Sequence, residues 1–286
     1  MRLIRPHLNE ITADTAVNVA QDDGPHVPAE LAALREAFRQ ADKPTRRALV
    51  PHLRPTEIEF AGIHMYVDPR DNYTDRRIWL DGHPPEMRSL TALMERIEGR
   101  NALIFDIGAN CGAFAVPLGL AAGPGSRVIA FEPNPVMIGR LGHNIALNNL
   151  GHVIRIEGCA IAGAPGEAML HLRRGNHGQS ALEPIFAAPA TDATLVPLRP
   201  LSDFLGTAEA HEVTVLKIDI EGGEDAALAP LLAQGAECGF LPEAMLIETA
   251  HARHWQGDLI GRITACGYAP VFEAEGNTLF VRQGRG

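Results

Sequence analysis

From residue 100 onward, short apolar segments alternate along the chain with longer segments of helical periodicity. The short segments have the length of buried strands, and the longer ones that of amphipathic helices. Repeated units of this kind predict an α/β fold with a doubly wound, mainly parallel sheet and helices on both faces. The predicted strands are residues 103–107, 127–131, 153–156, 213–220 and 244–248, and the predicted helices end near 122 or span 135–149, 224–233 and 259–266.

The last part of the chain has a different pattern. Residues 268–272 and 278–281 are apolar and flank Gly276-Asn277, which predicts an antiparallel hairpin that closes the sheet. Residues 163–200 are rich in Gly, Pro and Thr, with a hairpin-like segment at 167–172. We expect this stretch to be an insertion over the sheet edge or the functional site.

The length of 286 residues fits one large domain with an extension. We assign residues 56–286 to the α/β domain and residues 1–55 to an N-terminal extension that is partly helical. Helical spacing predicts helices at about 28–41 and at 87–97, and alternation predicts a strand–turn–strand at 56–68. Prolines at 44, 51 and 55 predict turns between these segments.

Charge, hydropathy and cysteine content argue against several classes of protein. The formal net charge of −10 disfavours a nucleic-acid partner, because phosphate affinity comes largely from clustered Lys and Arg. No apolar run approaches the ~20 residues that span a bilayer, so no membrane partner is expected. The four cysteines are far apart without a CxxC pair, which predicts neither a zinc knuckle nor a disulfide framework. With no signal peptide apparent, the sequence predicts a cytoplasmic protein.

The segment Leu103 to Phe114 combines an apolar strand, an acid near its end and a tight turn with two glycines. Ligands of open α/β sheets bind at such turns, and Gly108 permits a close approach that a Cβ would block. Asp106 would repel a pyrophosphate but suits a ligand with an ammonium group. Backbone N–H groups of the turn can receive a carboxylate. The methionine part of S-adenosylmethionine carries both groups.

Glu132 ends the next predicted strand, one β–α unit after Asp106. An acid at this place can accept both hydroxyl groups of a ribose, and Pro133 and Pro135 shape the turn and start the next helix. A nicotinamide or flavin site would require G-x-G-x-x-G directly after the strand, which this turn lacks. Two strand-end acids one unit apart therefore favour S-adenosylmethionine over NAD.

The sequence resembles the FkbM family of methyltransferases between about Thr56 and Arg282. The resemblance is carried by the segments Phe105 to Gly112, Phe131 to Pro135, Gly178 to Leu182, and Leu216 to Glu224. It implies a seven-stranded, Rossmann-like class I sheet and methyl transfer to an oxygen of a small molecule or a sugar-containing metabolite. It also implies that Asp106, Gly108 and Asn110 surround the methionine part, and that Cys159 and Ala160 lie beside the adenine. The complete expected cofactor site is Asp106, Gly108, Asn110, Gly112, Phe114, Glu132, Pro133, Asn134, Cys159, Ala160 and Asp219.

Candidates for the chemical step follow two further strands. Methyl transfer needs alignment of donor and acceptor and removal of a proton from the acceptor oxygen. Asp219, Glu248 and His251 are our catalytic candidates, with Asp219 or His251 as a general base. In the competing interpretation, Asp219 and Glu248 bind Mg²⁺ or another divalent cation, since hard cations prefer carboxylate oxygens.

Other polar residues near these strand ends have structural interpretations. Glu221 and Glu224 fit the start of the helix that follows, where acids are favoured. Lys217 fits a buried ion pair or a donor to a neighbouring backbone group, with a catalytic role as the disfavoured alternative. His177 and Gln179, in the Gly-rich stretch, are candidates for contact with the acceptor.

Three functions are compatible with these patterns. The leading hypothesis is an S-adenosylmethionine-dependent O-methyltransferase that acts on a hydroxylated small molecule or glycan. The second is a non-catalytic module that binds the cofactor and a partner protein, suggested by the unmatched N-terminal segment. The helix at 28–41 packs on its own domain or on a second subunit, so a homodimer is one candidate assembly. An NAD-dependent dehydrogenase is third, disfavoured by the missing glycine motif.

Overall fold

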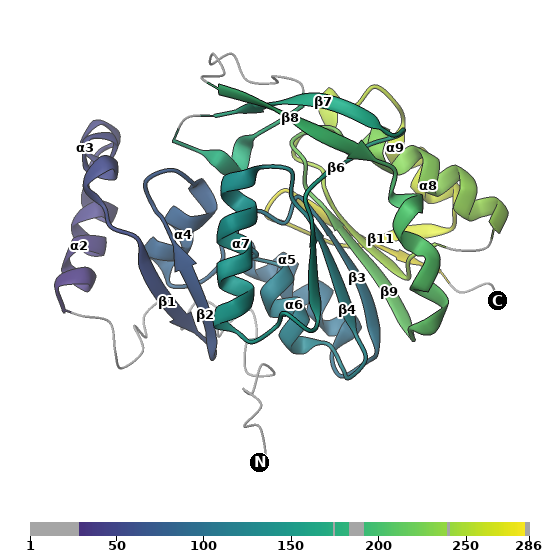
Figure 1. The fold of residues 1–286 in the computed structure, drawn as a ribbon, viewed down its shortest axis with the longest axis horizontal. Helices are drawn as coiled ribbons and strands as arrows, with labels where there is room; N and C mark the ends of the chain where they lie inside the picture. The colour runs from purple at the N-terminus through teal and green to yellow at the C-terminus, as the bar shows by residue number, and fades with distance from the viewer. Residues whose placement is uncertain (1–28, 174, 183–191, 239–240, 284–286) are drawn as a thin grey trace.

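A computed structural model describes residues 29–173, 175–182, 192–238 and 241–283 (Figure 1). Its centre is a seven-stranded sheet in the order β11-β12-β10-β9-β3-β4-β5. The strands β3, β4, β5, β9 and β10 are parallel, and β12 runs antiparallel to both β10 and β11. The predicted fold is therefore confirmed. The bounds are β3 Ala102–Ile107, β4 Arg127–Phe131, β5 Ile154–Glu157, β9 Val213–Ile218, β10 Ala244–Glu248, β11 Tyr268–Ala274 and β12 Asn277–Arg282.

The sequences of the central strands are mostly apolar on both faces, because helices cover the sheet on both sides. All six residues of β3 and all six of β9 are buried. Alternate side chains pack into two separate cores, with Ile104 and Val215 on one face and Phe105 and Leu216 on the other. The first core is covered by α5 (Met87–Ile97), α6 (Ala115–Ala121) and α7 (Pro135–Leu147), and the second by α8 (Glu224–Cys238), α9 (Leu259–Ala265) and the 3₁₀ segment η4 (Leu201–Ala210).

The order of connections reverses at β3, which lies between β4 and β9. Asp106 pairs in register with Ala130 on one side and with Lys217 on the other. In open α/β sheets such a reversal leaves a crevice at the carboxyl ends of the strands. The topology therefore places the predicted motifs beside one crevice.

The N-terminal part packs against the edge of this domain. It contains α2 (Ala29–Gln40), α3 (Lys43–Leu49), the 3₁₀ turn η2 (Val50–His52), the hairpin β1 (Thr56–Phe60) and β2 (Ile63–Val67), and α4 (Tyr73–Asp81). The Phe38 ring of α2 meets the Trp79 ring of α4 edge-on at 5.7 Å. Asn144 of α7 accepts a hydrogen bond from the Tyr66 N–H at 2.7 Å, which attaches the edge of β2 to the helix layer.

Two helices were not predicted from the sequence. The prolines suggested only turns near residue 44, but Pro44 occupies the first turn of α3, where its missing N–H is no loss. Asp42 caps this helix by accepting from the Thr45 N–H. The helix α4 has a polar sequence with a weak apolar pattern, and its Asn72 N-cap and left-handed Gly82 at the C-terminal end define its bounds.

Two strands from the described part of the stretch 163–200 join β6, which precedes it, in a second, three-stranded sheet in the order β6-β8-β7. Its members are β6 (Ala160–Ile161), β7 (Gly166–Leu172) and β8 (Asp192–Arg199), and β7 pairs antiparallel with residues 192–198 of β8. The sequence predicted β7 but not β8, because Thr, Pro and Ala obscure the alternation there. A short 3₁₀ turn, η3 (His177–Gln179), lies in the stretch between them.

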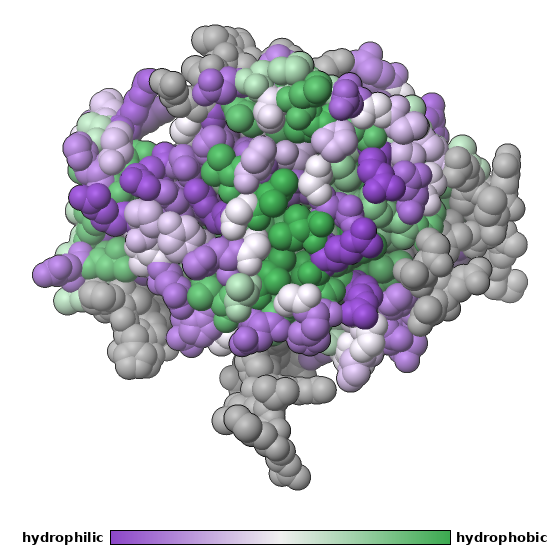
Figure 2. Space-filling model, in the orientation of Figure 1, coloured by the Kyte–Doolittle hydropathy of each residue, from purple (hydrophilic) through white to green (hydrophobic). Residues whose placement is uncertain are grey.

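The surface is mixed in polarity. Figure 2 shows apolar side chains gathered near the middle of one face, with polar side chains around them. Among the described residues, no helix is long and apolar enough to cross a membrane.

Candidate active site

A cavity of about 420 Å³ lies at the carboxyl ends of β3, β4 and β9. Its volume falls within the usual range for sites that bind small molecules and cofactors. The predicted cofactor residues that line it are Gly108, Asn110, Phe114, Glu132, Pro133, Cys159, Ala160 and Asp219. Asp106, Gly112, Asn134, Glu248 and His251 do not line it. The structure therefore gathers most of the predicted residues around one space and places the others behind its walls.

The turn between β3 and α6 is fixed by close backbone contacts. Gly108 has a φ of +78°, and a Cβ on it would lie 1.9 Å from the carbonyl oxygen of Asp219. Only glycine allows the tips of β3 and β9 to approach so closely. Gly112 has a φ of +94°, but its missing Cβ makes room for Leu141 of α7. Gly112 therefore serves helix packing, whereas Gly108 shapes the cavity.

Glu132 connects the turns that follow β3 and β4. Its two carboxylate oxygens accept hydrogen bonds from the backbone N–H groups of Asn110 and Asn134, each at 2.8 Å. Burial raises the pKa of Glu132 to about 7, against the effect of these two donors. Asn134 caps α7 through the Val136 N–H and donates from its side chain to Ser180 Oγ, so it positions neighbours rather than lining the cavity.

Asp106 lies beneath the cavity and is fully buried. The Lys217 ammonium is 3.5 Å from Asp106 Oδ1 and 3.8 Å from Asp219 Oδ2, and it donates to the Gly108 carbonyl at 2.9 Å. Lys217 lines the cavity and lies over the Phe114 ring. The buried ion pair expected for Lys217 is thus present, and it comes between Asp106 and the position where we expected a ligand ammonium.

The catalytic candidates lie at different depths. Asp219 lines the cavity, whereas His251 Nδ1 lies 3.1 Å from Glu248 Oε1 and 3.5 Å from Glu221 Oε2, behind the wall. Burial, with the charge of Asp219, raises the pKa of Glu248 to about 10 and that of Glu221 to about 8. Burial and the neighbouring carboxyl groups therefore favour the protonated form of Glu248. Within the described part of the chain, no group of three or more His, Cys, Asp or Glu residues is arranged to hold a metal ion.

Glu224 has the structural role considered for it. Its Oε1 accepts from the backbone N–H groups of Ile220 and Gly222, and its Oε2 accepts from the Trp255 indole at 2.8 Å. It therefore orders the loop after β9, at the start of α8.

The sequence analysis missed Glu86, which directly precedes α5 and also lines the cavity. Its Oε2 accepts from the Asn277 amide at 3.1 Å. Burial, followed by the charge of Asp219, raises the pKa of Glu86 to about 7. No local motif marks this residue, because the fold brings it from more than 100 positions upstream of Asp219.

The cavity offers two kinds of surface. Cys159, Ala160 and Ile161 form an apolar wall near the ends of β4 and β5, and Glu132 adds carboxylate oxygens beside it. Glu86, Asp219 and Glu221 provide carboxyl groups elsewhere in the lining, with Lys217 among them. This arrangement suits a ligand with a flat apolar ring, hydroxyl groups and a cationic part.

Of the two residues that the sequence predicted to contact the acceptor, only one lines the cavity. His177 lines the cavity, next to Gly178 and Ser180. Gln179 does not line it, and its side-chain oxygen accepts instead from Arg173.

Comparisons with known proteins find methyltransferases of similar structure. The chain is similar to a solved FkbM methyltransferase from Methylobacillus flagellatus KT, with 16% identity over 83% of this chain and 58% of that one and a TM-score of 0.42. It is also similar to magnesium protoporphyrin IX methyltransferase from Synechocystis PCC 6803 with bound SAM, with 9% identity over 91% of this chain and 100% of that one and a TM-score of 0.42. No curated protein sequence matches the chain.

The family comparison is more specific than these structural likenesses. The first of the two solved proteins is considerably longer, since this chain spans only 58% of its length. The methyltransferase FkbM domain, in contrast, matches residues 106–270, which is more than half of the chain and contains the glycine turn after β3, Glu132 and Asp219. The chain therefore belongs to the FkbM methyltransferase family.

Proposed function

We propose that this protein is an S-adenosylmethionine-dependent methyltransferase that methylates a hydroxyl group of a small, sugar-like or otherwise hydroxylated molecule. The observation that carries the proposal is the cavity at the point where strand order reverses, with Gly108, Glu132 and Asp219 in its walls. Family membership supports the reaction class. When bound, the donor supplies a methyl group on a positively charged sulfur.

The residues present fit such a donor. Gly108 lets the tips of β3 and β9 meet beside the cavity, since a Cβ there would overlap the Asp219 carbonyl. Glu132 is buried but keeps acceptor capacity for ribose hydroxyl groups beside its two backbone donors. Cys159 and Ala160 would contact the adenine, and Gly108 and Asn110 the methionine part. We expect Asp219, rather than Asp106, to contact the donor's cationic part, because Asp219 lines the cavity whereas Asp106 is fully buried beneath it.

Asp219 is also the best candidate to receive the acceptor's proton. It lines the cavity, whereas Glu248 and His251 lie behind it. A general base must come within hydrogen-bond reach of the proton that it removes. Glu86 and Glu221 would accept hydrogen bonds from further hydroxyl groups of the acceptor, which supports a polyhydroxylated substrate.

Calorimetric titration with S-adenosylmethionine and S-adenosylhomocysteine tests the donor. We expect both to bind, and Glu132→Ala to weaken binding by about tenfold or more, as expected for loss of charge-assisted hydrogen bonds. Absence of binding for both ligands would defeat the proposal. Repeating the titration with Mg²⁺ and with a chelator tests the hypothesis that Asp219 and Glu248 bind a metal ion. That hypothesis requires the dissociation constant of the donor to differ between the two conditions.

Separate measurements distinguish the methyltransferase from a dehydrogenase and from a non-catalytic module. Fluorescence titration with NADH tests the dehydrogenase hypothesis, which requires NADH to bind. For methylation, the measurement is transfer of labelled methyl groups to a panel of hydroxylated acceptors, in which Asp219→Asn should lower the rate. A non-catalytic module would bind the donor, transfer no methyl group and keep its partner when Asp219 is replaced. A cytoplasmic location and a homodimer remain predictions.

A further inference from the structure

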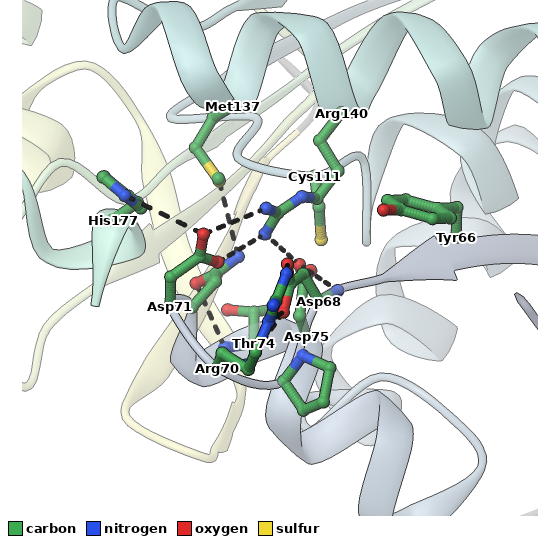
Figure 3. Close-up of polar contacts among 12 residues, drawn as sticks. Tyr66, Asp68, Arg70, Asp71, Thr74, Asp75, Cys111, Met137, Arg140 and His177 are labelled. Carbon is green, nitrogen blue, oxygen red and sulfur yellow. Dashed lines mark hydrogen bonds and ion pairs between the residues drawn. The ribbon is translucent and has the colours of Figure 1, made fainter. Parts of the chain in front are cut away.

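The start of α4, residues 71–76, contacts two parts of the cavity wall, and its Thr74 lines the cavity itself. Figure 3 shows Asp71 of this segment between His177 and Arg140. The His177 N–H donates to the Asp71 carbonyl at 2.7 Å, and the His177 Nε2 lies 4.0 Å from Asp71 Oδ2. The Tyr73 N–H donates to Asn176 Oδ1 at 2.9 Å. On its other side, Arg140 of α7 binds the Asp71 carboxylate at 3.0 Å and also binds Asp75. This segment precedes the residues that match the family, so the match does not account for it.

Asn72 connects the start of α4 to the turn after β3. It is fully buried, and its Nδ2 donates to Asn110 Oδ1 at 2.7 Å. Its own Oδ1 accepts from the Thr74 N–H at 3.3 Å, as an N-cap. In return, Asn110 Nδ2 donates to Thr74 Oγ1 at 3.4 Å. The side chain of Asn110, which lines the cavity, is thus held from two residues of α4.

Asn110 needs such support because its backbone is in the left-handed region, with a φ of +52°. This conformation is uncommon outside glycine, although asparagine adopts it more readily than most residues. The same residue donates its backbone N–H to Glu132 at 2.8 Å. A change in the orientation of Asn110 would therefore move a donor away from Glu132 as well as alter the cavity wall.

The turn at His177 packs on this pair. A Cβ on Gly178 would lie 2.6 Å from Asn110 Nδ2 and 2.7 Å from Asn72 Oδ1, so the Gly178 backbone rests directly on both amides. Asn134 donates to the His177 carbonyl from the other side at 3.3 Å. His177, Gly178 and Ser180 line the cavity. The start of α4 thus supports two adjacent parts of the wall.

We propose that Asn72 and Asp71 are positioning residues of the donor site, with Asn72 acting through Asn110 and Asp71 acting through His177. The proposal rests on the function proposed above, because it concerns the wall that the donor would contact. It assigns to the N-terminal part of the chain a role in completing the site, beyond packing on the domain.

Asn72→Ser separates positioning from helix capping. Serine is also a good N-cap, so α4 keeps its cap, but its short side chain cannot reach Asn110. We expect the dissociation constants of S-adenosylmethionine and S-adenosylhomocysteine to rise about tenfold. In an Asn110→Ala background the same substitution should change them less than twofold, because positioning residues act through their partner. Asp42→Ala, which removes the cap of α3, is the control and should leave both constants unchanged.

Additive effects of Asn72→Ser and Asn110→Ala would overturn the proposal, since they would show that Asn72 does not act through Asn110. If Asn72→Ser does not fold, Thr74→Val removes the other support of Asn110 with little change in volume. Because Thr74 also lines the cavity, the readout for this variant is hydrogen exchange of the unliganded chain. Exchange in the peptide covering residues 106–116 should be faster, and unchanged exchange would count against the proposal.

Hydrogen exchange of the unliganded full chain tests positioning without a donor. Asn72→Ser should speed exchange in the peptide covering residues 106–116, and Asp71→Ala should do so in the peptide covering 175–182. Asp42→Ala should affect neither peptide. Unchanged exchange in both variants would refute the positioning roles even if the donor binds. Faster exchange in a protein that binds no donor would instead refute only the proposed function.

Discussion

Gly108 shows how one residue sets the geometry of the cavity. Its φ of +78° and the 1.9 Å between an added Cβ and the Asp219 carbonyl are two separate obstacles to any side chain. Gly82, at the end of α4, has a similar φ of +81° but nothing within 4 Å of an added Cβ. The two glycines therefore allow conformational strain to be separated from steric overlap.

We predict that Gly82→Ala costs about 1 kcal/mol of unfolding free energy, the strain of a left-handed alanine. Gly108→Ala should cost about 3 kcal/mol or more, because the tips of β3 and β9 must also separate. Denaturant unfolding of both variants measures the difference. Equal losses would show that the contact with Asp219 is easily relieved.

Glu132 gives the protein a specific dependence on pH. Its pKa is about 7 in the folded protein, against 4.5 for a free glutamate, mainly because of burial. Its contribution to stability is thus fully present below pH 4.5, where both states are protonated. It is lost as the pH rises from 4.5 through about 7, where the unfolded chain ionises first.

The expected loss from Glu132 over this range is about 3 kcal/mol. Glu132→Gln should remove this part of the slope, whatever its effect on absolute stability. The measurement is the free energy of unfolding of both proteins at pH 4.5, 6 and 7.5. Parallel profiles for the two proteins would contradict the assignment to Glu132.

Among the elements, α4 and α7 are joined by a buried charge network (Figure 3). Arg140 of α7 is mostly buried and binds Asp71 and Asp75, and Asp75 is fully buried. Asp75 also accepts from the Asp68 N–H at 3.0 Å. Burial raises the pKa of Asp75 to about 6, against the effect of Arg140. The network therefore depends on Arg140 to balance a carboxylate without access to water.

Arg140→Met should destabilise the protein by about 3–5 kcal/mol, because it leaves Asp75 buried without its charged partner. Adding Asp75→Asn should recover part of the loss, since the amide is neutral and its oxygen can still accept from Asp68. Thermal or denaturant unfolding of the single and double variants checks this. A double variant no more stable than the single one would show that the loss comes from packing instead.

At the scale of the whole molecule, the extension and the α/β domain share one core. Phe38 and Leu53 belong to the same buried cluster as Ile104 and Val215 of the central sheet. The domain boundary that we placed at residue 56 stays a prediction, and among the described residues the core packing is continuous across it.

Phe38→Ala should destabilise the entire chain by about 3 kcal/mol, since it removes a buried aromatic side chain from a shared core. Tryptophan fluorescence, which includes Trp79 beside Phe38, and far-UV circular dichroism should shift to lower denaturant concentration together. An unchanged midpoint by circular dichroism would mean that the extension unfolds independently.

The sequence by itself determined the parallel sheet, the closing hairpin and the first two strand-end motifs. These follow from local patterns: apolar runs of strand length, helical periodicity and a glycine turn. It also located Glu132 and Asp219, because each directly follows or ends a strand and parallel strands share one carboxyl edge.

Only the tertiary structure decided how the charges are distributed around the cavity. Lys217 neutralises Asp106 across neighbouring strands, Glu86 comes from a distant loop, and Asn72 contacts Asn110 from the start of a helix with only a weak apolar pattern. Each of these contacts depends on which segments the topology brings side by side. Local propensity does not predict such pairings, because the energy of a buried polar group depends on partners far away in the chain.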